Sequence, residues 1–306
     1  MPAIEVEGLE KNYGSLKAVD GISFAVDKGE VFSLLGPNGA GKTTTIEILE
    51  GLRRQEGGTV KVLEMDPWKM GYELHKRIGV IPQGFKFLDY PTPKEAVRYY
   101  GVLFDKKVDP DKLLRRVILE EAANTWFQHL SGGQKQKLGM ALSLVNDPEV
   151  VFLDEPTTGL DPQARRAVWE VIRKLKTEGR TVMLTTHYLE EAEELADRVA
   201  IMNHGKIAAM GTTDEIEAKY GSGQRMVVKA GEDLLKFLKE NTKLQVRGDG
   251  GSVTIVLRDK DDALVALGAI EESGADWGDL AVRKDSLEDV FLKLLGDEGR
   301  AEKEGE

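Results

Sequence analysis

The sequence predicts an α/β protein with a larger domain around a mixed, mostly parallel sheet and a smaller α+β domain after it. Two short apolar runs, residues 31–35 and 150–153, lead directly into glycine-rich or acidic residues. Buried parallel strands end in this way at the sheet edge where ligands bind. Helical and strand patterns alternate up to about residue 220, and the order then changes to β-α-β-β-α-β.

Composition indicates a globular protein of the cytoplasm. Hydrophobic residues make up 41% of the chain, no apolar run approaches the ~18–20 residues of a membrane helix, and the N-terminal residues do not resemble a signal peptide. The absence of cysteine excludes disulfides, thiolate metal sites and cysteine nucleophiles. The formal net charge of −11 argues against a general nucleic-acid surface. Any role at a membrane would therefore require a partner.

Residues 36–43, GPNGAGKT, have the spacing G-x-x-x-x-G-K-[ST] of a phosphate-binding loop, with a strand before it and a helix predicted over 42–52. Glycines let backbone N–H groups turn toward a phosphate, and a helix N-terminus favours an anion. Lys42 is expected to bridge the β- and γ-phosphates, and Thr43 to offer its hydroxyl to Mg²⁺. A glycine-rich turn that binds nothing fits the lysine–threonine pair poorly. The predicted nucleotide contacts here are Gly36, Pro37, Asn38, Gly39, Ala40, Gly41, Lys42, Thr43 and Thr44.

The apolar run at 150–153 ends in Asp154 and Glu155. This pattern predicts a central strand with two carboxylates at its C-terminal edge. Asp154 is expected to hold Mg²⁺ through water. Glu155 is placed to act as the general base on a water molecule, an effect worth roughly 10²–10⁴ in rate. An acidic pair at the surface is a poor alternative because the preceding run is too apolar.

Two further strand ends carry candidate residues. Strand 78–81 ends at Gln83, which is placed to touch Mg²⁺ or the attacking water, and strand 181–185 ends at His187, one of four histidines, which could contact a γ-phosphate. As isolated loop residues both would be structural, but the neighbouring motifs favour function. The apolar segment after Gln83 predicts a docking groove for another protein, with core beneath a helical insertion as the alternative. Its large residues are Phe85, Phe87, Leu88 and Tyr90.

Residues 4–26 alternate in polarity and predict two antiparallel strands that are joined at Gly14 and Ser15. Tyr13 lies just before this turn. An aromatic ring there could stack on adenine, an interaction worth about 1–3 kcal/mol. A tyrosine at a sheet edge is the alternative, which the phosphate loop downstream makes less favourable.

A second anion site is predicted inside a mostly helical stretch over 94–146. Ser131 and two glycines precede a long helical pattern, and this combination can bind an anion at a helix N-terminus. An ordinary helix cap is the alternative. Because the chain has one phosphate loop, the second site suggests that it serves the phosphate of another molecule.

The second domain is predicted over 221–296, after a boundary near Tyr220. Strands at 225–229, 243–247, 253–257 and 276–283, with helices at 232–240 and 260–272, give a ferredoxin-like βαββαβ unit. An amphipathic helix at 286–295 is expected to dock on this domain, with docking on a partner as the alternative. The charged residues 297–306 are predicted to be disordered.

Together the motifs resemble those of the nucleotide-binding subunit of an ABC transporter, over about residues 4–220. GPNGAGKT resembles the Walker A loop, LSGGQ the ABC signature, VVFLDEP the Walker B strand with its catalytic glutamate, GLDP the D-loop, IPQ the Q-loop and TTH the switch histidine. These motifs occur in the order of the family. The stretch between Pro93 and Ser131 is short for the family, which predicts a reduced helical subdomain.

The resemblance implies a P-loop NTPase fold over 1–220, with a RecA-like mixed sheet, an antiparallel β subdomain and a helical subdomain at about 84–146. It also implies ATP and Mg²⁺ as cofactors and an ATP-dependent, head-to-tail homodimer. Each ATP would lie between Lys42 of one subunit and the signature residues of the other, with Asp161 crossing the interface. The implied signature contacts are Ser131, Gly133 and Gln134.

The resemblance further implies a role in transport. The segment THYLEEAEELADRVAIMNHGKI, the extra C-terminal domain and SLEDVFLKL resemble stand-alone ATPase subunits of exporters for drugs, lipids, polysaccharides or sodium. ATP hydrolysis, with Lys42, Gln83, Glu155 and His187 as catalytic residues, would power export through a separate membrane permease, which holds the chain on the inner face of the membrane.

Two alternatives remain. One is a soluble ABC ATPase that acts on ribosomes or nucleic acid, which the single phosphate loop, the lack of cysteine and the acidic charge disfavour. The other is a nucleotide-binding regulator without turnover, which the presence of Glu155 disfavours.

Overall fold

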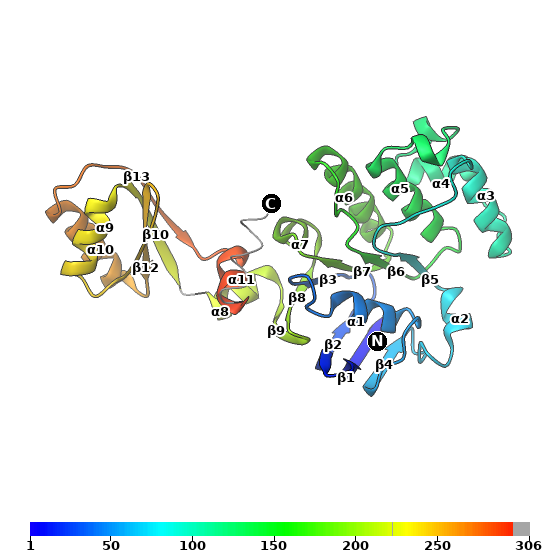
Figure 1. Ribbon diagram of the computed structural model, residues 1–306, viewed down its shortest axis with the longest axis horizontal. Coiled ribbons are helices and arrows are strands. Elements are labelled where there is room, and N and C mark those ends of the chain that lie inside the picture. The colour runs from blue at the N-terminus through cyan, green and yellow to red at the C-terminus, as the bar shows by residue number, and fades with distance from the viewer. Residues whose placement is uncertain (222, 296–306) are drawn as a thin grey trace. The chain divides into compact units, whose positions relative to one another are not determined.

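The computed structural model describes residues 1–221 and 223–295, and the predicted disordered tail lies outside them (Figure 1). The chain divides into two compact units, Met1–Thr212 and the residues from Thr213 onward. This division falls earlier than the predicted boundary at 220. The reason is that α8 (Thr213–Tyr220) packs against α11 (Leu287–Leu295), where Glu217 accepts a hydrogen bond of 2.9 Å from the Leu287 N–H.

A six-stranded sheet forms the centre of the first unit, in the order β5-β6-β7-β3-β8-β9. Its first five strands in this order run parallel, and β9 is antiparallel to β8. Every residue of β3, β6 and β7 is buried, as the apolar runs in the sequence predict. The strands are β3 (Val31–Leu35), β5 (Ile78–Ile81), β6 (Val150–Asp154), β7 (Thr181–Thr186), β8 (Arg198–Asn203) and β9 (Lys206–Gly211).

A second, antiparallel sheet has the order β2-β1-β4. It shares one hydrophobic core with the helix α1, and Phe24 of this sheet stacks on Phe32 of the central sheet with ring centroids 5.3 Å apart. The predicted helix 42–52 ends at Leu49, because Gly51 takes a left-handed φ of 77° that stops it. The elements are β1 (Ile4–Tyr13), β2 (Leu16–Val26), β4 (Gly57–Val62) and α1 (Lys42–Leu49).

Helices on the other side of the central sheet enclose a second core. The predicted helical stretch 94–146 contains three α-helices and two short 3-10 helices, Glu120–Ala122 and Phe127–His129. The remaining helices of the unit flank the sheet strands. The α-helices are α2 (Gly71–His75), α3 (Pro93–Leu103), α4 (Pro110–Arg116), α5 (Gly132–Ser143), α6 (Pro162–Thr177) and α7 (Leu189–Leu195).

The apolar segment after Gln83 divides between the two predicted alternatives. Phe85 and Phe87 pack against the core, with Phe127 at ring distances of 6.1 and 6.0 Å. Leu88 and Tyr90 are 67% and 70% exposed. The first half of the segment is therefore core, and the second half is a free apolar surface.

In the second unit, four antiparallel strands lie in the order β11-β12-β10-β13, with α9 and α10 on one face (Figure 1). The elements follow one another in the predicted order β-α-β-β-α-β. Met226, Val228 and Ala230 alternate along β10 and enter the core beneath the helices. The elements are β10 (Gln224–Ala230), α9 (Glu232–Asn241), β11 (Gln245–Asp249), β12 (Ser252–Leu257), α10 (Lys260–Glu272) and β13 (Trp277–Lys284).

We expect Phe152→Ala to destabilise the chain by about 3–5 kcal/mol, because it leaves a cavity in the central strand β6. Phe152 is fully buried. Urea denaturation followed by tryptophan fluorescence measures the loss. Leu88→Ala, at an exposed position, should change the free energy of unfolding by no more than about 0.5 kcal/mol. Equal effects of the two substitutions would contradict this description of the core.

Candidate nucleotide-binding and catalytic site

The loop between β3 and α1 has the shape of a phosphate cradle. Gly39 and Gly41 take φ values of 79° and 103°, which side chains rarely adopt. A Cβ atom at Gly36 would lie 2.3 Å from the Met202 carbonyl oxygen, and one at Gly41 would lie 2.2 Å from that of Ala18. No side chain caps the N-terminus of α1 in the described structure. The glycines are therefore required by the backbone, and the helix end is suited to an anion.

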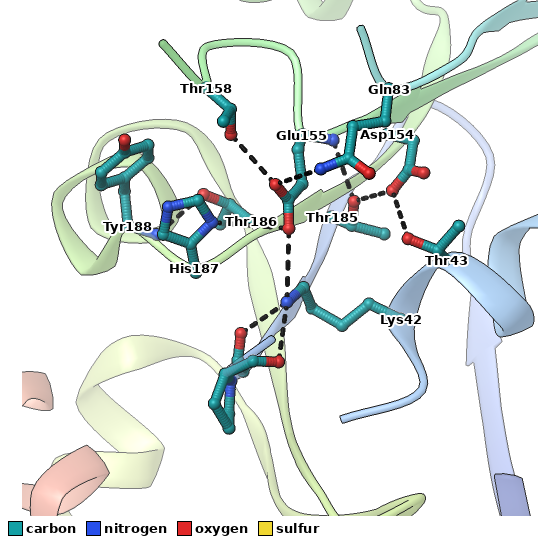
Figure 2. A network of polar contacts seen from close by, with 12 residues as sticks. Lys42, Thr43, Gln83, Asp154, Glu155, Thr158, Thr185, Thr186, His187 and Tyr188 are labelled. Carbon is teal, nitrogen blue, oxygen red and sulfur yellow. Dashed lines mark hydrogen bonds and ion pairs between the residues drawn. The ribbon is translucent and has the colours of Figure 1, made fainter. Parts of the chain in front are cut away.

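Lys42, the first residue of α1, is buried and its ammonium group points back across the loop (Figure 2). Its Nζ donates hydrogen bonds of 2.6 and 3.0 Å to the carbonyl oxygens of Gly36 and Pro37. It also lies 3.5 Å from Glu155 Oε1. The side chain thus connects the phosphate loop with the acidic end of β6.

Asp154 ends β6 and faces the first turn of α1. Its Oδ1 accepts hydrogen bonds from the hydroxyls of Thr43, at 3.3 Å, and Thr185. Burial raises the pKa of Asp154 above its ordinary value, although the two hydroxyls and Lys42 act in the opposite direction. A hydroxyl and a carboxylate oxygen, both hard donors, therefore meet at one point.

Glu155 lies at the centre of the polar network in Figure 2. Its φ of 47° turns the chain sharply after β6 and directs the carboxylate back over the loop. One oxygen, Oε2, accepts hydrogen bonds of 2.9 Å from Gln83 and 3.0 Å from Thr158. The other, Oε1, lies 3.4 Å from His187 Nδ1. The structure therefore brings together Lys42, Gln83, Glu155 and His187, which the sequence predicted from four separate segments.

The charge of Glu155 is stabilised by its neighbours. Burial by itself raises the pKa of this carboxyl, but the His187 ring, the Lys42 ammonium and the Thr158 hydroxyl together lower it to about 2. Glu155 is therefore ionised at neutral pH, as a group that accepts a proton must be.

Three polar residues of the site were missed in the sequence. Thr158 and Thr185 contact the two carboxylates directly, and Glu191 is a buried acid that joins the loop after β6 to α6. Glu191 accepts hydrogen bonds of 2.9 Å from Thr157 and 3.0 Å from Trp169. Threonines are common at strand ends, and an acid in a helix among other acids reads as solvated, so no pattern indicated these contacts.

The predicted second anion site is separate from this network. Ser131 and Gln134 form a reciprocal capping box at the start of α5, with hydrogen bonds of 2.9 and 3.3 Å. Asp161 caps α6 and accepts a hydrogen bond of 2.9 Å from the Ala164 N–H. Gly133 lies against α6, where a Cβ atom would be 2.8 Å from that of Ala164. Within the described chain these residues serve their own helices, which is the local role that any N-cap has.

Tyr13, the last residue of β1, is 40% exposed. Lys11 Nζ and the Arg53 guanidinium carbon lie 5.7 and 5.6 Å from the centre of its ring. The ring is thus available at the surface, and its stacking on adenine stays a prediction.

A groove of about 400 Å³ lies beside β5 and the apolar segment after Gln83. Its wall is mainly apolar, and Glu50, which follows α1, also lines it. The large apolar lining residues are Leu52, Ile78, Val80, Phe85, Tyr100, Phe104 and Leu142.

Among residues 1–221 and 223–295, none of the helices has the length and apolar character that a membrane-spanning segment needs.

The parallel sheet, the glycine cradle with its lysine and the two carboxylates define a P-loop nucleoside triphosphatase. The family model described as "ABC transporter" matches residues 19–158. The daunorubicin resistance ATP-binding protein DrrA3 of Streptomyces coeruleorubidus is 38% identical, over 97% of each chain. The Nod factor export ATP-binding protein I of Ralstonia nicotianae is 39% identical, over 98% of this chain and 95% of its own.

Solved structures agree with the sequence comparisons. An ATP-binding subunit of an ABC transporter is similar with a TM-score of 0.64 and 29% identity, over 71% of this chain and 93% of its own. A nucleotide-free ATP-binding cassette from an ABC transporter has a TM-score of 0.62 and 25% identity, over 71% and 94%. The chain therefore belongs to the ABC transporter family, as an ATP-binding subunit that hydrolyses ATP to drive transport.

We expect the stabilising effect of the Glu155 charge to disappear in acid. Because its pKa is lowered from 4.5 to about 2, the ionised group stabilises the folded state fully above pH 4.5, and this contribution is lost as the pH falls toward about 2. Melting temperatures of the wild type and Glu155→Gln, compared from neutral pH downward, measure it. The wild type should lose stability relative to the variant over this range. A difference that does not change with pH would contradict the assigned cause.

Proposed function

We propose that two copies of this chain form a head-to-tail dimer that binds two ATP molecules, hydrolyses them with Mg²⁺ and drives export through a separate membrane protein. The observation that carries this proposal is that the polar groups suited to a nucleotide lie in two separate places on one chain. Lys42, Asp154 and Glu155 form one complete half of a nucleotide site, whereas Ser131 and Gln134 present a helix N-terminus outside it.

The residues of the network have separate roles in this proposal. Lys42 would exchange the carbonyl oxygens of Gly36 and Pro37, and the carboxylate of Glu155, for phosphate oxygens of ATP. Glu155, released from that ion pair, would accept a proton from the attacking water. His187, 3.4 Å from the same carboxylate, is placed to contact the γ-phosphate and hold the water in line.

The donors that meet at the end of β6 fit Mg²⁺. Thr43 and Asp154 offer oxygen ligands 3.3 Å apart, and the amide oxygen of Gln83 can complete the set, since its nitrogen contacts Glu155. In the described residues no group of three acids or histidines could hold a metal by itself. This suits Mg²⁺, which binds few protein ligands and takes the rest from water and nucleotide phosphates. When bound, it would neutralise charge on the phosphate oxygens.

The start of α5 supports the dimer. The Ser131 hydroxyl and the N–H groups of this helix end can bind an anion, and in the described residues the side chains of Ser131 and Gln134 form hydrogen bonds only with each other's backbone. In a head-to-tail pair, Ser131, Gly133 and Gln134 would meet the ATP held by Lys42 of the other copy. Asp161, which caps the adjacent α6, would lie at the interface. Tyr13 would stack on the adenine.

Export through a membrane protein is supported by the relatives. Their names concern daunorubicin resistance and the export of Nod factor, and both match nearly the whole chain. The apolar groove beside β5, with the exposed Leu88 and Tyr90 near it in sequence, is the surface we assign to the membrane partner. Such a partner would hold the chain on the cytoplasmic side of the membrane.

A pull-down tests this proposal. Tagged Glu155→Gln protein would be incubated with ATP and detergent-solubilised membranes, and the bound proteins identified by mass spectrometry. We expect a polytopic membrane protein in an amount similar to that of the bait. Recovery of ribosomal or nucleic-acid-bound proteins alone would overturn the transport role in favour of a soluble ABC ATPase.

Glu155→Gln should retain ATP binding and lower the rate of hydrolysis by roughly 10²-fold or more, because the amide cannot accept the proton of water. ATP affinity is measured by equilibrium binding and the rate by phosphate release. Glu178→Gln serves as the control, since Glu178 follows α6 and contacts Arg116 outside the site. Unchanged turnover in Glu155→Gln would remove Glu155 from the role of base.

Ser131→Arg should abolish ATP-dependent dimerisation, because a long cation replaces the hydroxyl that faces the nucleotide of the other copy. Size-exclusion chromatography of this variant in the Glu155→Gln background, with and without ATP, measures it. Thr177→Arg, at the exposed C-terminal end of α6, is the matched control. A normal ATP-dependent dimer from Ser131→Arg would argue against the shared site.

A further inference from the structure

One acidic residue, Glu50, lies on the wall of the apolar groove beside β5, and its carboxyl group is buried. Glu50 follows the last residue of α1, lines the groove and is only 3% exposed. Its Oε1 atom is buried and has no hydrogen-bond partner in the described structure. A carboxyl group in such a place is costly unless another group satisfies it.

Three other polar side chains of the wall, those of His75, Asn146 and Ser143, already form hydrogen bonds. His75 Nε2 donates a hydrogen bond of 2.8 Å to the Glu50 carbonyl oxygen, and Asn146 donates to the carbonyl oxygens of His75 and Ile78 at 3.0 and 2.8 Å. Ser143 donates to the Met140 carbonyl oxygen at 2.9 Å. Among the residues that line the groove, Glu50 alone has a buried side-chain atom without a hydrogen-bond partner in the described structure, so a ligand of the groove would gain a new polar contact there.

The electrostatic surroundings of Glu50 favour a cation. Burial raises the pKa of Glu50 to about 8, and the nearby carboxylates of Asp154 and Glu47 add to the effect. The negative end of the α1 dipole lies at the same place. A positive group would restore the ionised carboxylate and also interact favourably with the helix end. Lys86, also on the groove wall, is exposed and forms no ion pair with Glu50 in the residues described.

We propose that the membrane partner places a lysine or arginine side chain in this groove, where it pairs with Glu50 at the C-terminal end of α1. This inference rests on the proposed function, because it assumes a membrane partner. It adds that the docking segment of that partner has apolar residues around one lysine or arginine. A basic side chain paired with Glu50 would contact the C-terminal end of α1. The other end of this helix begins at Lys42 of the phosphate loop, about 12 Å from Glu50 along the helix axis.

The isolated protein provides the first test. Because Oε1 of Glu50 has no hydrogen-bond partner among the described residues, Glu50→Gln should melt at the same temperature as the wild type or higher at neutral pH. Glu50→Leu should behave in the same way. A melting temperature several degrees lower in both variants would mean that Glu50 serves the fold, and it would overturn the inference.

The second test repeats the pull-down with the tagged protein carrying Glu50→Gln as well. We expect recovery of the membrane protein to fall by about tenfold or more, because an apolar groove then receives an unpaired base. Glu47→Gln is the control, since it removes the same charge from the same helix but Glu47 already pairs with Arg53. Equal recovery with Glu50→Gln and the parent would overturn the inference and leave the transport role intact. No membrane protein with the parent itself would overturn both.

A charge exchange identifies the pair. Carbodiimide coupling and peptide mass spectrometry should join Glu50 to a lysine of the recovered protein. Arginine does not couple to a carboxyl group in this reaction. If the partner supplies an arginine, Glu50→Arg should be combined with an arginine-to-glutamate substitution in the partner, and this exchange should restore recovery of the membrane protein. Failure of both coupling and exchange would contradict a direct pair.

Discussion

The ion pair between Lys42 and Glu155 is the interaction on which the site depends. Both side chains are almost fully buried, and their charged atoms lie 3.5 Å apart. Removing two charges from water is costly unless further hydrogen bonds satisfy them. Here those bonds come from the carbonyl oxygens of Gly36 and Pro37 on one side, and from Gln83 and Thr158 on the other. The pair can persist only while the phosphate loop, the Gln83 loop and the end of β6 keep their places.

The parallel sheet supplies that precision. Strands β3, β6 and β7 are adjacent and fully buried, so their C-terminal ends meet at one edge in fixed register. The pairings of Leu35 with Thr186 and of Asp154 with Thr185 bring the start of the phosphate loop, the Asp154 carboxylate and the His187 loop close together. The nucleotide then needs only to replace contacts that the protein already makes with itself.

The sequence predicted which residues would meet at this edge of the sheet, because its motifs have fixed spacings. A glycine cradle needs glycine at 36 and 41 for steric reasons, and a strand with no polar residue before Asp154 and Glu155 has to be central. Residues such as Thr158, Thr185 and Glu191 act through tertiary contacts, and their types are ordinary for their local positions. The domain boundary was misplaced for the same reason, because the packing of α8 on α11 joins segments far apart in the chain. Likewise, Glu50 has the sequence position of an ordinary helix residue, and its lack of a partner for Oε1 is visible only in the described structure.

The account depends most on the sharing of each ATP between two copies of the chain. A mixture of two inactive variants tests it: Lys42→Ala, which lacks the phosphate-binding lysine, and Ser131→Arg, which lacks the second anion site. In a mixed dimer, Lys42 of one copy faces Ser131 of the other, so one site is intact. The account predicts that mixing the two variants restores ATP hydrolysis that neither has alone. If both are inactive alone and their mixture remains inactive although mixed dimers form, each site must be built within one chain, which contradicts the shared site.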